Sequence, residues 1–198
     1  VNDRLGGFNS AKIILYSLDG GTFSKMEMQA VQGDWGMMKQ NLVLGAKRLK
    51  AGGADFVIFS AIGLNQIADE IQEKAGIPVL SLVDTIGGRI HDHGLRSVLL
   101  LGTRSTMESG FLRDNLGKKY GITVVVPEKN DREYIHQVIF DAVMAEKPNP
   151  DSNKRIQSII DRLAKEQGVQ GVVLAFSRIP LVIDQKEISI PSFDAMAV

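Results

Sequence analysis

Two spacings of hydrophobic positions alternate along the chain. Short runs of β-branched and aliphatic residues have the length of strands, and longer stretches between them carry apolar residues three and four positions apart. Strands buried on both faces show little polar alternation, so the pattern predicts an α/β fold with parallel sheets covered by helices. The predicted strands are Ala11–Leu18, Asp55–Ser60, Ile77–Val83, Arg96–Gly102, Ile122–Val126, Gly171–Ala175 and Glu187–Ile190. The predicted helices are Trp35–Ala51, Asn65–Lys74, Thr106–Tyr120, Asp131–Ala145 and Asn153–Gln167.

The two halves of the chain repeat one local order of helix, glycine turn and buried run. We therefore predict two similar α/β lobes, residues 1–94 and 95–198, with the boundary in the stretch 87–94. Ligands of open parallel sheets bind beyond the carboxyl ends of the strands. We expect a cleft between the lobes, lined by the loops that follow Leu18, Phe59, Gly102 and Leu174.

Composition removes several classes of function. The 198 residues hold 23 Lys and Arg against 23 Asp and Glu, and this neutral balance gives no electrostatic basis for binding nucleic acid or an anionic membrane. The apolar runs are far shorter than the ~20 residues of a spanning helix. Without cysteine there is no disulfide, thiolate metal site or cysteine nucleophile, and three histidines, two of them in the stretch His91-Asp92-His93, leave little for a metal. The first residues show no apolar signal region, so we expect a cytoplasmic protein.

Several stretches, in order over nearly the whole chain, carry a resemblance to a known family. They are Leu5–Ser10, Ala68–Gln72 with Ile77–Leu80, Leu100–Met107, Val126–Asp131 with Ile139-Phe140, and Gly171–Pro180. In this series the chain resembles the aspartate/glutamate racemases, which are cofactor-independent amino-acid racemases. The resemblance implies two α/β lobes with the active site in the cleft between them, no cofactor, a small amino or carboxylic acid as ligand, and a homodimer or higher oligomer.

The first catalytic position of that family has lost its thiol. Counting back from Ala68–Gln72 puts Ser60 where the resemblance implies a cysteine. Ile62 and Gly63 stand where family members use an asparagine and a threonine to hold the substrate carboxylate. Ser60 is either a residual substrate contact or a residue that begins a turn or caps the next helix.

The second catalytic position has changed as well. Counting from Ile179-Pro180 puts Phe176 at the other cysteine position, followed by Ser177 and Arg178. Racemisation needs one group to remove the α-proton and an opposite group to return one, and a phenyl ring cannot transfer a proton. We expect Phe176 to fill core space. Ser177 is a candidate substrate contact, and Arg178 either holds a carboxylate or lies on the surface.

Two further residues are candidates for substrate contact. Thr103 follows a predicted strand, although Thr106 beside it also fits the start of a helix as an N-cap. Asp19 follows another predicted strand, although Asp-Gly-Gly is also a turn sequence.

Two functional readings from different classes follow, and a purely structural role stays open beside them. The first is a degenerate family member that binds a small acid or a partner subunit without racemising. The second is an active racemase that works by a route without thiols. Family members also begin with a strand upstream of the region matching Val1–Leu5 and continue beyond the region matching Phe193–Val198, so either the 198 residues belong to a longer chain or the first lobe is rearranged.

Overall fold

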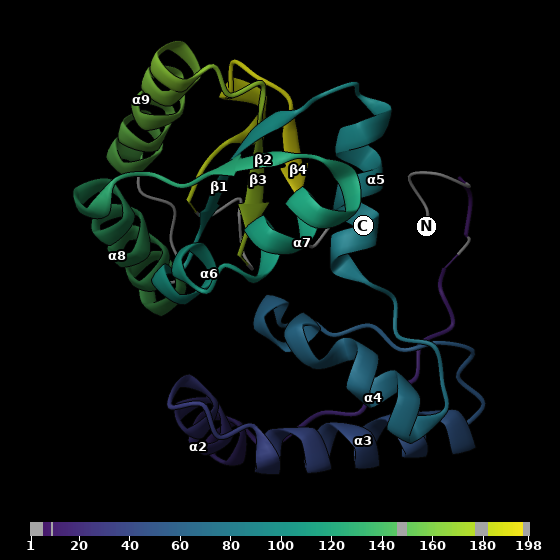
Figure 1. The fold of residues 1–198 in the computed structure, drawn as a ribbon. Coiled ribbons are helices and arrows are strands. Elements are labelled where there is room, and N and C mark those ends of the chain that lie inside the picture. Colours follow the sequence, from purple (N-terminus) through teal and green to yellow (C-terminus); the bar gives the residue numbers. More distant parts are fainter. Residues whose placement is uncertain (1–5, 9, 146–149, 177–181, 196–198) are drawn as a thin grey trace. The chain divides into compact units, whose positions relative to one another are not determined.

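The structure, a computed structural model, describes residues 6–8, 10–145, 150–176 and 182–195 (Figure 1). The chain forms two compact units. Unit 1 comprises residues 1–58 and 67–80, and unit 2 comprises residues 59–66 and 81–198. The boundary predicted in the stretch 87–94 falls within a helix of unit 2, α5 (Leu82–Asp92) and its C-cap. The division into lobes 1–94 and 95–198 therefore stays a prediction about the family fold, separate from these compact units.

Unit 2 is built on a four-stranded parallel sheet. The strands are β1 (Ser97–Gly102), β2 (Thr123–Val125), β3 (Gly171–Ala175) and β4 (Ser192–Asp194), in the spatial order β2-β1-β3-β4. All three pairings are parallel, and in the β1–β3 pair Gly102 lies opposite Ala175. The predicted α/β class is confirmed.

Helices cover both faces of this sheet. On one face lie α5 and α7 (Phe111–Tyr120), and on the other lie α8 (Lys129–Ala145) and α9 (Pro150–Gln167) (Figure 1). The pleat of β1 divides its side chains between the two cores, because Leu99 and Leu101 pack with α8 and α9 while Val98 and Leu100 pack with α5 and α7. Unit 2 also contains the short helices α6 (Arg104–Glu108) and η3 (Gln185–Glu187), and residues 62–66 of the 3-10 helix η1 (Ile62–Ile67).

The contact between α5 and α7 depends on one glycine and one carboxylate. A Cβ at Gly87 would lie 2.4 Å from the ring of Tyr120, so the ring occupies the space that a larger residue would need. The carboxylate of Asp84 accepts hydrogen bonds from Lys119 at 3.1 Å and from the Tyr120 hydroxyl at 3.1 Å. Burial raises the pKa of Asp84, but the hydrogen bonds from Lys119, the Ser81 hydroxyl and Tyr120 outweigh it, so this pKa lies below its ordinary value.

Unit 1 is mainly helical in the residues that the structure describes. It contains α2 (Gly20–Val31), α3 (Gly36–Ala51) and α4 (Ala68–Ala75), with α3 packed against both of the others. Their buried side chains include Met26, Met38 and Ile71. A single parallel bridge joins Val57 to Val79. The 3-10 helix η1 (Ile62–Ile67) precedes α4 in the chain.

Four of the predicted strands require correction. Residues 11–18 form no strand, residues 55–60 and 77–83 contribute only the bridge between Val57 and Val79, and α5 already begins at Leu82. The side chains of Ile13 and Phe56 are 79% and 57% exposed, so these apolar runs lack the neighbouring strands that a buried sheet would give them. The run predicted at 187–190 precedes the real strand, β4. Helices α2 and α5 were not predicted.

Candidate functional site

The carboxyl ends of β1 and β3 bring two of the predicted site residues to one edge of the sheet. Gly102 and Ala175 are the last register partners of the two strands, and Thr103 and Phe176 are the residues that directly follow them. The two strands approach closely here, because a Cβ at Gly102 would lie 2.8 Å from the carbonyl oxygen of Ala175. Glycine at this position is thus a packing requirement of the sheet edge.

Thr103 is the N-cap of α6. Its hydroxyl accepts a hydrogen bond from the backbone N–H of Thr106 at 3.4 Å, and it lies 2.9 Å from the Thr106 hydroxyl and 3.1 Å from that of Ser105. The sequence offered Thr106 as the capping residue, but the cap is Thr103. The three hydroxyls can donate or accept hydrogen bonds, and they supply no charge and no general base.

Phe176 packs into the core beyond the end of β3. Its side chain is 5% exposed and belongs to the cluster formed with Leu101 on β1, Met107 on α6 and Val182. The expectation that Phe176 fills core space is borne out by this burial. At this position the chain offers neither an acid nor a base.

Ser60 lies in an exposed bend that leads into η1. The loop that follows is held to the core of unit 2 by Ile62. This residue is 9% exposed and packs with Leu82 on α5, Val173 on β3 and Ala175. Ser60 therefore stands at the surface of unit 2, beside a loop fixed to the same core as the β1–β3 edge. A contact between Ser60 and a ligand stays a prediction.

Asp19 caps a helix in unit 1. Its carboxylate accepts hydrogen bonds from the backbone N–H of Thr22 at 2.8 Å and from the Thr22 hydroxyl at 2.9 Å, at the start of α2. The backbone hydrogen bond from Thr22 is the main reason why the pKa of Asp19 lies below its ordinary value. The Asp-Gly-Gly sequence is thus the beginning of a helix. Ser177 and Arg178 lie outside the described residues.

Sequence reasoning missed the buried amide side chain of Asn65 in η1. It is 8% exposed, its Nδ2 donates to the carbonyl of Ile62 at 3.1 Å, and its Oδ1 accepts from the backbone N–H of Leu82 at 3.3 Å. The available signal was an asparagine between the apolar residues Leu64 and Ile67. Periodicity alone gave no reason to separate it from an exposed helical position.

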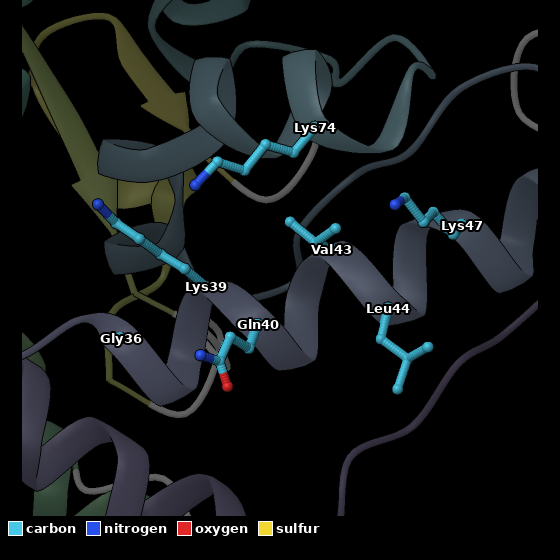
Figure 2. A pocket seen from close by; sticks show the side chains of 7 residues that line it. All are labelled: Gly36, Lys39, Gln40, Val43, Leu44, Lys47 and Lys74. Atoms are coloured by element: carbon cyan, nitrogen blue, oxygen red, sulfur yellow. The ribbon is translucent and has the colours of Figure 1, made fainter.

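A groove of about 420 Å³ lies on unit 1, away in sequence from every predicted site residue. Figure 2 shows its lining, which comes from α3 and from one residue of α4: Gly36, Lys39, Gln40, Val43, Leu44, Lys47 and Lys74. Lys39 and Lys74 both pair with Glu70, at 2.5 Å and 2.6 Å, and these hydrogen bonds lower the pKa of Glu70. The groove offers lysine ammonium groups and aliphatic surface, and none of the described residues that line it carries a hydroxyl, thiol or carboxylate.

The described part of the chain contains neither a cluster of metal-binding side chains nor a membrane-spanning helix. There, no set of three or more His, Cys, Asp or Glu side chains is placed to hold a metal ion. Over the same residues, no helix has the length and apolar character needed to span a membrane.

Comparison with known proteins identifies the family. The model of the Asp/Glu/Hydantoin racemase family matches residues 18–198. The chain belongs to this family. A candidate Asp/Glu racemase from Yersinia pestis is 36% identical, with a TM-score of 0.87 over 100% of this chain and 84% of that one. PH1733, an aspartate racemase homologue from Pyrococcus horikoshii OT3, is 28% identical, with a TM-score of 0.87 over 98% and 83% of the two chains. The broad specificity amino-acid racemase RacX of Bacillus subtilis is 24% identical over 81% of this chain and 68% of its own.

Because the chain belongs to this family, Ser60 and Phe176 can be compared with the catalytic cysteines that the resemblance implies at these positions. The sequence holds no cysteine, so the thiols that the resemblance implies at Ser60 and Phe176 are both absent. One position now carries an exposed hydroxyl and the other a buried phenyl ring. Near the β1–β3 edge, the polar groups include the hydroxyls of the Thr103 cap and the next residue, Arg104, whose guanidinium pairs with Glu133 and whose backbone N–H lies 3.4 Å from Nδ1 of His136. This arrangement can form hydrogen bonds to a small ligand.

Proposed function

We propose that this racemase-family protein binds a small amino or carboxylic acid and catalyses little or no racemisation. The observation that carries the proposal is the side chain of Phe176, which is 5% exposed at the position of the second thiol. A two-base exchange needs a proton donor or acceptor on each side of the α-carbon. A hydrocarbon side chain packed in the core can be neither.

The first thiol position supports the same conclusion. A serine hydroxyl is a far weaker acid than a thiol and needs an adjacent general base to act as a nucleophile or base. Ser60 is exposed to solvent, and the loop that follows it carries Ile62 and Gly63, which offer no side-chain donor to a carboxylate. The hydroxyls near Thr103 leave hydrogen-bonding capacity for a ligand at the sheet edge.

The test measures binding and proton exchange on the same preparation. The protein is incubated in D2O with L- and D-aspartate, L- and D-glutamate and a panel of other amino acids, and deuterium at Cα is followed by NMR. Calorimetry on the same ligands measures binding. RacX of Bacillus subtilis, a relative named as a racemase, serves as the positive control. We expect saturable binding of at least one ligand with no deuterium incorporation above the protein-free rate.

Two results would overturn the proposal. Steady deuterium incorporation accompanied by formation of the opposite enantiomer would establish an active racemase that works without thiols. The absence of saturable binding for the whole panel would remove the ligand-binding role and leave a structural role or a partner subunit. Deuterium exchange is the more sensitive measurement, because a single-base reaction labels Cα even without net racemisation.

Association between copies of the chain is a second part of the proposal. Unit 1 leaves apolar side chains in solvent, among them Ile13, Leu15 and Ile58 with exposures of 79%, 83% and 64%. Apolar surface on extended segments favours association. We expect a dimer or higher oligomer, and light scattering that reports a monomer over a wide concentration range would refute this. The cytoplasmic location also stays a prediction, to be checked by cell fractionation.

A further inference from the structure

Asn65 and Ser152 are the buried polar residues of the chain that the structure describes. Both polar ends of the Asn65 amide are satisfied: Nδ2 donates to the carbonyl of Ile62, and Oδ1 accepts from the backbone N–H of Leu82. The partners fix which way the amide points, because a carbonyl only accepts and a backbone N–H only donates. A polar group that is buried without hydrogen-bond partners destabilises the folded state. Because both ends of the Asn65 amide have partners, this position is typical of a specific structural hydrogen bond.

The two hydrogen bonds join a loop to a helix end. Ile62 belongs to the loop that begins at Ser60, and Leu82 is the first residue of α5. The first backbone N–H groups of a helix have no partner within the helix. Ser81 caps α5 through the N–H of Asp84, and Asn65 satisfies the N–H of Leu82 from 17 residues away in the sequence.

The side chains on either side of this link share one core. Ile62 is 9% exposed and Leu82 is 7% exposed, and both pack in the cluster that contains Val173 and Ala175 of β3. Apolar packing holds the loop near the sheet but is non-directional. The Asn65 amide adds direction, because hydrogen bonds constrain the angle and register of the loop backbone.

We propose that Asn65 is a positioning residue of the ligand site, and this inference rests on the proposed function. It fixes loop 60–64 against the first turn of α5 and so holds Ser60 in position for a small amino or carboxylic acid. A loop that is already ordered loses less conformational entropy when a ligand binds. Release of the loop should therefore weaken binding by about 10-fold or more, with a smaller effect on the rest of unit 2.

The test variant is Asn65→Asp, which keeps an acceptor for the Leu82 amide and removes the donor to the Ile62 carbonyl. The matched control is Asn115→Asp on α7, where the native Nδ2 also donates to a backbone carbonyl, that of Phe111, at 2.8 Å. Hydrogen exchange by mass spectrometry follows the amides of residues 60–66 and 82–92 separately. Calorimetry with L-aspartate, L-glutamate and their D-enantiomers as probes measures affinity.

For Asn65→Asp we expect at least 10-fold faster exchange in residues 60–66, nearly native exchange in α5, and at least 10-fold weaker binding of the probe that the native chain binds. The control should change neither the loop nor the affinity. Native loop exchange and native affinity in Asn65→Asp would overturn the inference, as would equal weakening in both variants.

Two further outcomes also test the inference: a variant that does not fold, and a native chain that binds no probe. If Asn65→Asp does not fold, the native protein decides by NMR: the Leu82 amide should exchange as slowly as those of Ile86 and Ile90, and an unprotected Leu82 amide would overturn the link. If the native chain binds no probe, the proposed function fails. In that case native exchange of loop 60–66 in Asn65→Asp would overturn the anchoring role, whereas faster exchange would support it alone.

Discussion

Restoring the second thiol should damage the protein without restoring catalysis. In Phe176→Cys most of a phenyl ring is removed from a side chain that is 95% buried, given its exposure of 5%. Truncation of a core phenylalanine to alanine costs about 3–5 kcal/mol, and the sulfur of cysteine recovers part of this. We therefore expect the free energy of unfolding to fall by about 2–4 kcal/mol. If the free energy of unfolding falls by roughly 2 kcal/mol per M of urea, the midpoint of urea unfolding falls by about 1–2 M.

The matched control is Phe140→Cys on α8, which makes the same chemical change at a side chain that is 55% exposed. We expect a loss of at most about 1 kcal/mol there, because surface changes have small effects. Urea unfolding followed by circular dichroism compares both variants with the native chain. Equal losses in the two variants would show that Phe176 does not carry the core packing that its burial indicates.

The double variant Ser60→Cys with Phe176→Cys tests catalysis. We expect it to stay close to inactive on aspartate and glutamate, because Ile62 and Gly63 do not hold the carboxylate and a misplacement of about 1 Å can cost ~100-fold. A buried thiol also has a raised pKa and little thiolate. We expect activity only when Ile62→Asn and Gly63→Thr are added, and the buried position of Ile62 gives the first of these its own stability cost.

Circular dichroism of aspartate enantiomers over time measures the racemisation. Rapid racemisation by the double variant alone would show that the carboxylate site survives elsewhere in the chain. Ile62 and Gly63 would then not be the cause of inactivity, and the proposal of a degenerate site would be wrong.

Three further predictions concern the packing of unit 2. Gly87→Ala places a methyl group 2.4 Å from the native position of the Tyr120 ring, so we expect a net loss of about 1–3 kcal/mol in urea unfolding, and a gain would contradict the packing. Asp84 has a lowered pKa in the folded state, so its stabilising effect is present above the ordinary pKa of aspartate and is lost as the pH falls through the folded value. Asp84→Asn should therefore remove at most about 1 kcal/mol at pH 7 and flatten the acid limb of a stability-against-pH curve, because the contact with Lys119 is partly exposed; an unchanged limb would refute this. Gly102→Ala places a methyl group 2.8 Å from a β3 carbonyl oxygen, and we expect a loss of about 1–3 kcal/mol by thermal unfolding, whereas native stability would show that the strand ends separate easily.

Strong local periodicity determined much of the fold from the sequence. The helix predicted at 35–51 is α3, those predicted at 131–145 and 153–167 are most of α8 and α9, and the buried runs at 96–102 and 171–175 are β1 and β3. In each of these elements, the spacing of the apolar residues alone indicates which side chains are buried. The α/β class and the family resemblance follow from the same positions and needed no knowledge of contacts.

Tertiary contacts decided the elements whose local signal was ambiguous. The apolar run at 11–18 has the composition of a strand, but a strand also needs a hydrogen-bonded neighbour, which a single segment cannot specify. Helix α5 was hidden by the apolar run that ends at Val83 and by Gly87 and Gly88, which lower helix propensity. Packing against Tyr120 explains why a glycine is accepted at position 87.

The candidate site divides in the same way. Counting from the stretches that resemble the family located Ser60 and Phe176 in the sequence, and composition alone established that neither is a cysteine. Only the tertiary structure brought the residues before Thr103 and Phe176 together, because the pairing of Gly102 with Ala175 depends on strand register. It alone also showed the hydrogen bond between Asn65 and Leu82, because a hydrogen bond to a helix end 17 residues away leaves no periodic pattern in the sequence.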